Sequence, residues 1–291
     1  MKIVDILKQS THLNYNSILN IINYIANYSH AQIIANNNLE LSPTQYQQYL
    51  SVLSRLKLNE PLSYILGFKD FYNHRFYIDN SVLIPRADSE ILVEFAIKTS
   101  KEMLANNNPH SQKHFRVLEL GTGSGCIAIS IDKELQKIAN NNYQAVEVIA
   151  TDISIDALNI ASYNAKLLSS QVQFINSNWF SNIKKTDNLS EKFDLIISNP
   201  PYIAADDPHL VNLTYEPRIA LTDELDGLSH ITAIANEASS FLKPSATIAI
   251  EHGYNQQRAV AKILKQANFQ NCGCLHDYGN NPRVSYGKSH R

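Results

Sequence analysis

The first 75 residues carry apolar side chains at helical spacing. Isoleucines recur every three or four positions and would form one face of a helix: Ile18, Ile21, Ile22 and Ile25. A second helix is predicted to begin at Pro43, because Ser42 can cap its free N–H groups and proline suits the first helical position. We predict a small N-terminal helical domain over residues 1–75, acting either as a cap on the main domain or in substrate recognition.

Residues 76–114 have the pattern of a linker. An extended segment ends in the apolar run 82–84, and a helix is predicted from Asp88, whose side chain can cap it. The polar cluster Asn106–His110 predicts a loop ahead of the next domain.

From residue 115 onward, short runs of β-branched residues alternate with helical segments. Strands are predicted at 116–120, 146–151, 172–175, 193–198 and 247–252. Helices are predicted from about Gly125, around 157–165, at 229–242 and up to Ala267. This alternation predicts an α/β domain over residues 115–291 with a mostly parallel, doubly wound sheet, in which ligands bind beyond the carboxyl ends of the strands.

Composition places this domain pair among cytoplasmic proteins. Of the 291 residues, 44% are hydrophobic, yet no apolar run approaches the length that spans a bilayer. Asp5 and Lys8 interrupt the N-terminal apolar residues, which argues against a signal peptide. Three cysteines are too few for a disulfide framework and fit a reducing compartment. No cysteine and histidine spacing predicts a metal site.

The charge balance bears on the class of partner. The formal net charge is −2, whereas proteins that grip nucleic-acid phosphates usually show a basic excess. We therefore expect no direct sequence-specific binding of nucleic acid, and an enzyme acting on DNA is disfavoured.

The turn Glu119–Gly125 (ELGTGSG) follows a predicted strand and opens a predicted helix. Glycines in this context let the backbone turn sharply and approach a ligand closely. Gly123, Gly125 and Ala128 also satisfy the G-x-G-x-x-A pattern of dinucleotide enzymes, so a nicotinamide cofactor has to be considered. A tight turn without a ligand is the alternative.

Asp152 ends the next predicted strand. A carboxylate at this position can accept both hydroxyls of an adenosine ribose, which fits NAD and S-adenosylmethionine equally. The alternative is a helix N-cap, because a helix is predicted to begin immediately afterwards.

The tetrapeptide Asn199–Tyr202 (NPPY) decides between these cofactors. It follows the strand expected beside the glycine-rich strand, so it lies near the cofactor. Two prolines offer carbonyl acceptors without N–H donors, Asn199 offers an amide oxygen, and Tyr202 offers a flat face. These groups suit a planar NH₂ group whose delocalised lone pair must be oriented towards a sulfonium methyl, a geometry for which hydride transfer has no use.

Together with the glycine-rich turn and Asp152, NPPY resembles the amino-methyltransferases, which include N6-adenine DNA methyltransferases and protein glutamine methyltransferases. Further stretches narrow the resemblance to the bacterial peptide chain release factor N5-glutamine methyltransferases. They are Glu60–Gly67 with Phe71 and Tyr72, Leu83–Glu90, Tyr215–Leu221, Asp226–Leu228, Glu251–Gly253, and Asp277–Gly279 with Arg283. The resemblance is strong from residue 60 to the end, and over the earlier helices it holds only in length and helical character.

The resemblance implies a seven-stranded, Rossmann-like class I methyltransferase domain with S-adenosylmethionine as donor and S-adenosylhomocysteine as product. The implied acceptor is the side-chain amide of the glutamine in the GGQ loop of class-1 release factors. The implied cofactor contacts are Glu119, Gly121, Thr122, Gly123, Ser124, Gly125, Asp152, Asn178, Trp179, Phe180 and Asn199. The implied substrate contacts are Asn199, Pro200, Pro201 and Tyr202, of which Asn199, Pro200 and Tyr202 are the candidate catalytic residues.

The chain departs from the family pattern at three positions. Asn178 stands where the family usually has an acid, so a contact to the adenine amino group would use the Asn178 oxygen or be weaker. Ala87 replaces a proline, and Ser89 replaces a threonine while keeping its hydroxyl.

Several other residues could be taken for catalytic or substrate-binding ones, but each also has a structural explanation. We expect His252 to be structural because methyl transfer needs no histidine, and a core role competes for Trp179. We expect an ion pair between Glu216 and Arg218 in the loop after NPPY, with contact to the substrate backbone as the alternative. Arg86 either faces the partner or pairs with Glu90.

Three other functions remain open from the sequence. A ribosomal-protein glutamine methyltransferase would share NPPY but, on our interpretation, not the Ile84–Asp88 segment. An N6-adenine DNA methyltransferase would need a basic target-recognition region. A non-catalytic, cofactor-binding protein that docks on release factors would not need the intact Asn199.

Overall fold

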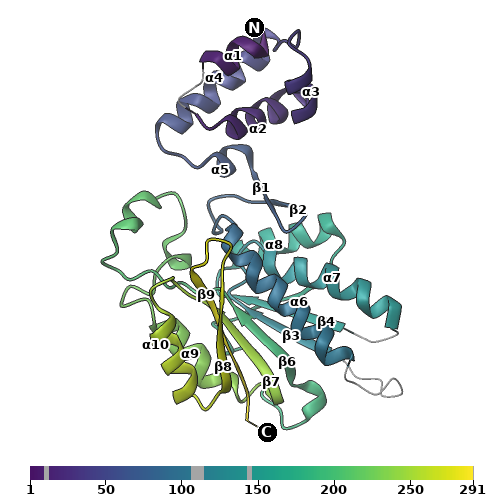
Figure 1. Ribbon diagram of the computed structural model, residues 1–291, viewed down its shortest axis with the longest axis vertical. Coiled ribbons are helices and arrows are strands. Elements are labelled where there is room, and N and C mark those ends of the chain that lie inside the picture. Colours follow the sequence, from purple (N-terminus) through teal and green to yellow (C-terminus); the bar gives the residue numbers. More distant parts are fainter. Residues whose placement is uncertain (10–12, 106–114, 143–145, 291) are drawn as a thin grey trace. The chain divides into compact units, whose positions relative to one another are not determined.

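The computed structural model describes residues 1–9, 13–105, 115–142 and 146–290, so the loop predicted at Asn106–His110 lies outside the described residues. The chain divides into two compact units, Met1–Phe68 and Lys69–Arg291 (Figure 1). Each unit has a hydrophobic core of its own.

The first unit is helical, as its apolar spacing predicts. Its helices are α1 (Ile3–Gln9), α2 (Tyr15–Ala26), α3 (His30–Ala35), α4 (Pro43–Lys57) and α5 (Leu62–Leu66). The isoleucines Ile18, Ile21 and Ile22 are buried in its core, while Ile25 packs against that core. The predicted start of α4 is confirmed: the Ser42 hydroxyl accepts the N–H of Gln45 at 3.2 Å.

The helical region ends earlier than predicted. Instead of helix up to residue 75, a two-stranded hairpin of β1 (Phe68–Phe71) and β2 (His74–Tyr77) follows α5. Phe71 of β1 and Phe76 of β2 are buried. Strands of four residues are too short for an alternating pattern to stand out in the sequence, which explains the error.

The helix predicted from Asp88 is confirmed, but its predicted cap is wrong, because Asp88 lies inside a 3₁₀ turn ahead of the α-helix and no described side chain caps that turn. A 3₁₀ turn, η1 (Ala87–Ser89), leads directly into α6 (Glu90–Ala105). The Glu90 carboxylate accepts the backbone N–H of Tyr72 at 3.1 Å, which ties α6 to the hairpin turn.

Within the described residues, the second unit is built on a seven-stranded sheet in the order β5-β4-β3-β6-β7-β9-β8. The strands are β3 (Phe115–Leu120), β4 (Val146–Asp152), β5 (Gln173–Asn176), β6 (Phe193–Ser198), β7 (Leu242–Glu251), β8 (Gln270–His276) and β9 (Pro282–Lys288). Strands β3 to β7 pair in parallel, and β9 runs antiparallel to both neighbours. The predicted seven-stranded, Rossmann-like α/β fold of this unit is confirmed.

The sequence pattern alone did not locate β8 and β9. Most of β8 is only half-buried or exposed, and it contains a glycine and several polar residues. A strand at the sheet edge needs no continuous apolar run, so its signal is weak.

Helices cover both faces of the sheet (Figure 1). The α-helices after β3 are α7 (Cys126–Asn142), α8 (Ile155–Leu168), α9 (Ser229–Ala238) and α10 (Gln257–Gln266), and the 3₁₀ turns are η2 (Leu189–Glu191), η3 (Pro208–Asn212) and η4 (Arg218–Ala220). Helices α6, α7 and α8 lie on one face, and α9 and α10 lie on the other. Adjacent residues Val117 and Leu118 of β3 enter the two different cores, as the alternation of a strand requires.

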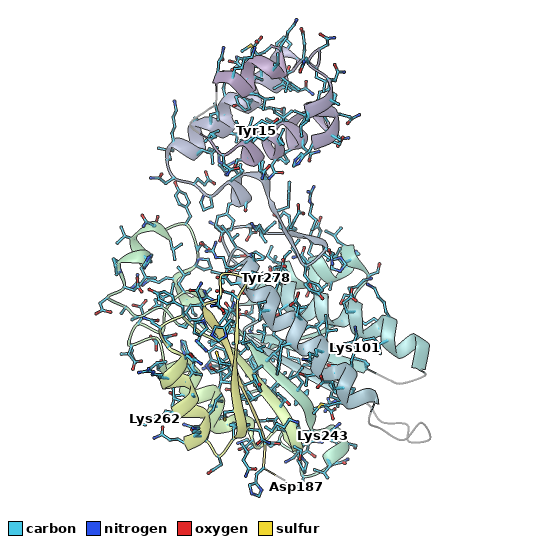
Figure 2. The ribbon with its side chains drawn as sticks, viewed as in Figure 1. Tyr15, Lys101, Asp187, Lys243, Lys262 and Tyr278 are labelled. Carbon is cyan, nitrogen blue, oxygen red and sulfur yellow. The ribbon has the colours of Figure 1, made fainter. Side chains whose placement is uncertain are left out.

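Charged side chains project from the outer faces of these helices. Lys101 on α6 and Lys262 on α10 are exposed (Figure 2), whereas Val260 and Leu264 on the inner face of α10 are fully buried. Within the described ranges, no helix has the length and apolar character needed to cross a membrane.

Candidate active site

A cavity lies in the second unit at the carboxyl ends of β3, β4 and β6. Its walls come from the glycine-rich turn after β3, the end of β4, the segment after β5, and the NPPY loop after β6. The rest of the lining comes from the segment 81–89, the first residues of α7, α8 and α9, and residues 217–220 around η4. This is the position at which open α/β sheets bind their ligands.

The glycine-rich turn is held against β4 by its backbone. The N–H groups of Gly121 and Thr122 both donate to the Thr151 carbonyl at 2.9 Å. Gly121 has a φ of 74°, and a Cβ there would lie 3.4 Å from the Trp179 ring. Glycine at this position therefore serves both the turn and the close approach of the aromatic side chain.

Gly123 and Gly125 have different roles in the same turn. Gly123 faces open space in the cavity wall, where a Cβ would meet no atom within 4 Å. Gly125 does not line the cavity, and its Cβ would lie 2.9 Å from Ile129 and 3.1 Å from Ala161. The structure thus places Gly125 at the packing contact between α7 and α8.

We expect Gly125→Ala to cost more stability than Gly123→Ala. Both glycines have a positive φ, of 80° and 55° respectively, which costs an alanine about 1 kcal/mol. Gly125→Ala also forces its methyl into Ile129 and Ala161, which adds about 2 kcal/mol. Urea unfolding of the two variants measures the difference, and equal losses would contradict the packing role of Gly125.

Glu119 lies beneath the turn and does not line the cavity. Its Oε2 accepts the Thr122 hydroxyl at 2.5 Å and the Ala128 N–H at 3.1 Å. Burial raises the pKa of Glu119 to about 7, although these two hydrogen bonds favour the ionised form. The structure therefore places Glu119 outside the cavity lining, where its carboxylate supports the turn.

The pKa of Glu119 predicts a pH-dependent stability. The folded protein holds this proton more tightly than the unfolded chain, whose glutamate has a pKa near 4.5. Stability is therefore lost as pH rises from about 4.5 to about 7. Glu119→Gln lacks this titration. We therefore expect the difference in free energy of unfolding, variant minus wild type, to increase by about 1–3 kcal/mol as the pH rises across this range. Urea titrations at several pH values test this, and parallel pH curves would contradict it.

Asp152 ends β4 and faces the cavity. Its Oδ2 accepts the Gly123 N–H at 2.8 Å, and its Oδ1 accepts the Ser154 N–H at 2.9 Å. Burial raises its pKa, against the effect of these two N–H groups. Ser154, and not Asp152, is the N-cap of α8, because its hydroxyl accepts the Ala157 N–H at 3.2 Å. The N-cap alternative for Asp152 is wrong, and each carboxylate oxygen keeps capacity to accept a further hydrogen bond.

The segment after β5 separates into lining and core residues. Asn178 is exposed, and both it and the half-buried Trp179 line the cavity. Phe180 is instead buried and stacks on Phe241 with ring centroids 4.5 Å apart. The structure thus brings Asn178 and Trp179 to the cavity but leaves Phe180 in the core.

His230, at the start of α9, was not identified from the sequence. Its ring lies 5.2 Å from the Trp179 ring, and both residues line the cavity. A single histidine in a helix carries no sequence signal that would distinguish this position. The tilted pair offers two aromatic faces to a planar ligand.

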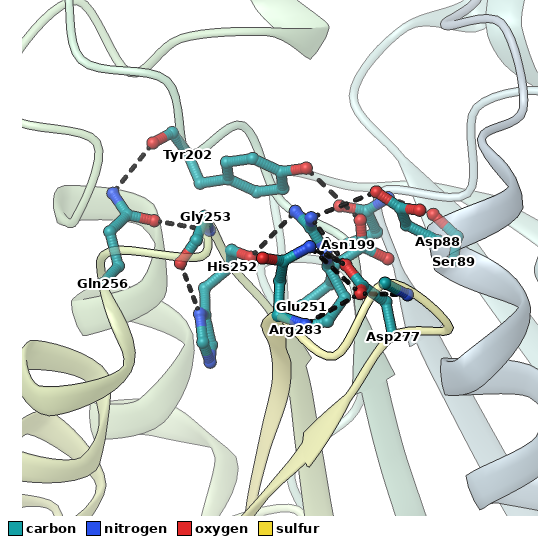
Figure 3. A network of polar contacts seen from close by, with 12 residues as sticks. Asp88, Ser89, Asn199, Tyr202, Glu251, His252, Gly253, Gln256, Asp277 and Arg283 are labelled. Carbon is teal, nitrogen blue, oxygen red and sulfur yellow. Dashed lines mark hydrogen bonds and ion pairs between the residues drawn. The ribbon is translucent and has the colours of Figure 1, made fainter.

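The NPPY loop brings Asn199 and Pro201 to the cavity wall. Pro200 is buried, and its side chain does not line the cavity. The Asn199 amide nitrogen donates to the Ser89 hydroxyl at 3.0 Å. The half-buried Tyr202 also stands outside the lining; its hydroxyl donates to Glu251 at 3.3 Å, and its carbonyl accepts from Gln256 at 2.9 Å (Figure 3).

The segment 81–89 is the main part of the site whose position the sequence did not reveal. Arg86 forms an ion pair with the buried Glu216, whose other oxygen accepts the Ile84 N–H at 3.0 Å. The predicted pairs of Glu216 with Arg218 and of Arg86 with Glu90 are therefore wrong. Arg218 pairs with Glu224 instead, at 2.5 Å.

His252 has the structural role expected of it. Its ring is buried, with Nε2 2.8 Å from the Ser285 hydroxyl and Nδ1 2.8 Å from the Gly253 carbonyl. Burial lowers its pKa.

Two family models match the chain. One, described as a methyltransferase domain, covers residues 111–285, and the other, described as the PrmC N-terminal domain, covers residues 17–67. The release factor glutamine methyltransferase of Haemophilus influenzae is 36% identical over 89% of this chain and 86% of its own length. The chain belongs to the release factor glutamine methyltransferase family. It is an S-adenosylmethionine-dependent methyltransferase.

Other relatives of this methyltransferase agree with the assignment. The release factor glutamine methyltransferase of Bordetella pertussis is 36% identical over 91% of both chains. A bifunctional methyltransferase of Rickettsia felis is 37% identical over 84% of this chain, which spans about half (48%) of that relative. The solved protein-(glutamine-N5) methyltransferase (release factor-specific) of Alicyclobacillus acidocaldarius is 26% identical over 74% of this chain and 100% of its own, with a TM-score of 0.40, and the assignment does not rest on it.

The cavity of the methyltransferase fits S-adenosylmethionine. A carboxylate at the end of β4 suits ribose hydroxyls, and the Trp179–His230 pair suits an adenine ring. Gly123 leaves open space where the backbone can approach the ligand. The cavity wall also carries the Asn199 amide, so a methyl acceptor held by Asn199 would share the cavity with the cofactor.

Proposed function

We propose that this methyltransferase transfers the methyl group of S-adenosylmethionine to the side-chain amide nitrogen of the glutamine in the GGQ motif of class-1 release factors. S-adenosylhomocysteine is the second product. The observation that carries the proposal is the Asn199 amide at the cavity wall, with its nitrogen bonded to Ser89 and its oxygen left to accept. The names of the relatives support the choice of acceptor.

The chemistry follows from the acceptor that a glutamine side chain presents. Its amide nitrogen is a weak nucleophile because its lone pair is delocalised into the carbonyl. Asn199 Oδ1 and the Pro200 carbonyl accept its two N–H bonds, and the Tyr202 ring lies against its plane. Bound S-adenosylmethionine supplies an electrophilic methyl group on a positively charged sulfur. Two acceptors on the N–H bonds aim the lone pair and stabilise the positive charge that develops on nitrogen, which then loses a proton.

The remaining cavity residues hold the cofactor in this proposal. Asp152 accepts the ribose hydroxyls, Trp179 flanks the adenine, and the Asn178 oxygen faces the adenine amino group. The backbone of Gly121 and Gly123 allows close approach at the turn. Glu119, Gly125 and Phe180 lie outside the cavity lining and support these residues from behind.

The two units divide the work. We assign release factor recognition to the helical unit, Met1–Phe68, and methyl transfer to the second unit, in which the segment between the hairpin and β3 contributes Ser89 and Arg86 to the site. Release factors act on ribosomes, so the site of action is the cytoplasm.

A comparison of acceptors tests the proposal. The purified protein is incubated with labelled S-adenosylmethionine and a full-length release factor, the same factor with its GGQ changed to GGA, a ribosomal-protein fraction, or unmethylated duplex DNA. We expect label on the release factor alone and none on the GGA variant. Label on ribosomal protein or DNA would replace the proposed acceptor, and cofactor binding without transfer would favour a docking protein.

A further inference from the structure

The Asn199 amide has two ends of similar shape and opposite hydrogen-bonding character. Its oxygen accepts hydrogen bonds, and its nitrogen donates them. Only the oxygen can hold an N–H of the substrate amide. Asn199 Nδ2 lies 3.0 Å from Ser89 Oγ, so the nitrogen is occupied on the side of η1. The planar amide then leaves its oxygen for the cavity.

Ser89 fixes this orientation only if its own proton is engaged elsewhere. A hydroxyl both donates and accepts, so a free Ser89 could serve either end of the Asn199 amide. The Ser89 hydroxyl interacts with the Glu251 side chain and favours its ionised form. Glu251 Oε2 is buried, and no hydrogen bond of standard geometry reaches it from the described residues, so Ser89 is a donor that can satisfy it. An ionised carboxylate only accepts, which makes the direction of this chain of hydrogen bonds unambiguous.

Glu251 also contacts Tyr202, another residue of the NPPY loop that we assign to substrate binding. The Tyr202 hydroxyl donates to Glu251 Oε1 at 3.3 Å. Arg283, whose charge favours the ionised form of Glu251, forms ion pairs with Asp88 at 3.1 Å and Asp277 at 3.0 Å. Figure 3 shows these groups from η1, β7, β9 and the NPPY loop in one network.

We propose that Ser89 and Glu251 are positioning residues for methyl transfer: the Glu251 carboxylate accepts a hydrogen bond from the Ser89 hydroxyl, and the Ser89 oxygen then accepts the N–H of the Asn199 side chain, so that the Asn199 oxygen faces the substrate. Neither residue touches the reacting atoms in this arrangement. The inference rests on the proposed function, because it assigns these residues to the Asn199 amide contact.

Substitutions at Ser89 test the hydroxyl directly. Ser89→Thr keeps the hydroxyl, whereas Ser89→Val has nearly the shape of threonine without it. We expect Ser89→Val and Ser89→Ala to lower kcat for release factor methylation about 10-fold or more, with KM changed less than about 3-fold. Ser89→Thr should restore kcat to near the wild-type value. Ser100→Ala is a matched control, because this buried serine donates to the Ala96 carbonyl within α6 and lies outside the network.

The pH profile provides a readout that a purely structural role would not change. Burial raises the pKa of Glu251 to about 7, against the Ser89 hydrogen bond and the Arg283 charge. The titratable and charged groups that face Glu251 are Asp88 on η1, Arg283 on β9, Tyr202 after β6 and Cys126 at the start of α7. A protonated Glu251 can donate to Ser89, whose proton is then free to bond the Asn199 oxygen and reverse the amide.

We therefore expect the wild-type kcat to fall as pH drops below about 7. Glu251→Gln, which cannot ionise, should have a low kcat without this acid limb, while its affinity for S-adenosylmethionine, measured by calorimetry, stays within about 3-fold of wild type. Wild-type kcat in both Ser89→Ala and Ser89→Val, or the same pH profile in Glu251→Gln as in wild type, would overturn the inference. Failure of the wild type itself to methylate the release factor would overturn the proposed function, and this inference with it.

Discussion

Asn199→Ala is expected to abolish methylation of the release factor while the protein still binds S-adenosylmethionine. The substitution removes the amide oxygen that would accept one N–H of the substrate glutamine, so the lone pair of its nitrogen is no longer aimed. Loss of one such preorganised contact should lower kcat about 10²–10³-fold. Cofactor affinity, measured by calorimetry, should stay within a few fold, because Asp152 and Trp179 are unchanged.

Asn188→Ala is the matched control for this result. Asn188 is also an asparagine whose side chain bonds locally, accepting the Ser190 N–H at 3.1 Å, and it is exposed at the start of η2. It should retain wild-type transfer. Near-full activity in Asn199→Ala would show that another group orients the acceptor and would refute the amide-holding mechanism.

Asp152→Ala is expected to weaken S-adenosylmethionine binding by about 100-fold or more. Hydrogen bonds from ribose hydroxyls to a carboxylate are charge-assisted, and two would be lost together. The substitution also releases the N–H groups of Gly123 and Ser154, which loosens the glycine-rich turn. Asp152→Asn keeps one oxygen without the charge and should give an intermediate affinity.

Asp156→Ala controls for the loss of a nearby carboxylate. Asp156 lies in the first turn of α8, shortly after Asp152 in the sequence. Its side chain is exposed and does not line the cavity. Isothermal titration calorimetry of the three variants gives the affinities. Wild-type affinity in Asp152→Ala would mean that the ribose lies elsewhere and that the orientation of the cofactor proposed above is wrong.

The sequence could predict the parts of the fold that carry strong local signals. Strands β3, β4 and β6 are buried apolar runs, and α4 begins with a serine cap and a proline, so each is recognisable from a few neighbouring residues. The hairpin β1–β2 and the edge strand β8 are short or half-exposed, so their patterns are not distinctive.

The site shows the same division. The glycine-rich turn, Asp152 and NPPY follow strands directly, and the parallel sheet necessarily brings them to one edge. The contact of Ser89 with Asn199 joins positions 110 residues apart, and that of Ile84 with Glu216 joins positions 132 apart. Neither depends on spacing along the chain. Tertiary packing alone creates them, which is why the pairs expected from nearby residues were wrong.

Phe180 and Gly125 show a further limit of sequence reasoning. Both belong to segments that line the cavity. The Phe180 ring nevertheless packs on Phe241, and a Cβ at Gly125 would point at Ala161. Whether a residue of a binding segment faces the ligand or the core depends on the local backbone. Trp179, for example, has a φ of 48°, which no residue pattern indicates.

The position of the methyl group on the acceptor tests the central claim most directly. A release factor treated with the purified protein and S-adenosylmethionine is digested, and the peptide that contains the GGQ loop is fragmented in a mass spectrometer. We predict one added methyl group on the glutamine side chain, absent when Asn199→Ala replaces the wild type. A methyl group on any other residue of that peptide, or an unmodified glutamine after treatment with the active enzyme, would contradict the account.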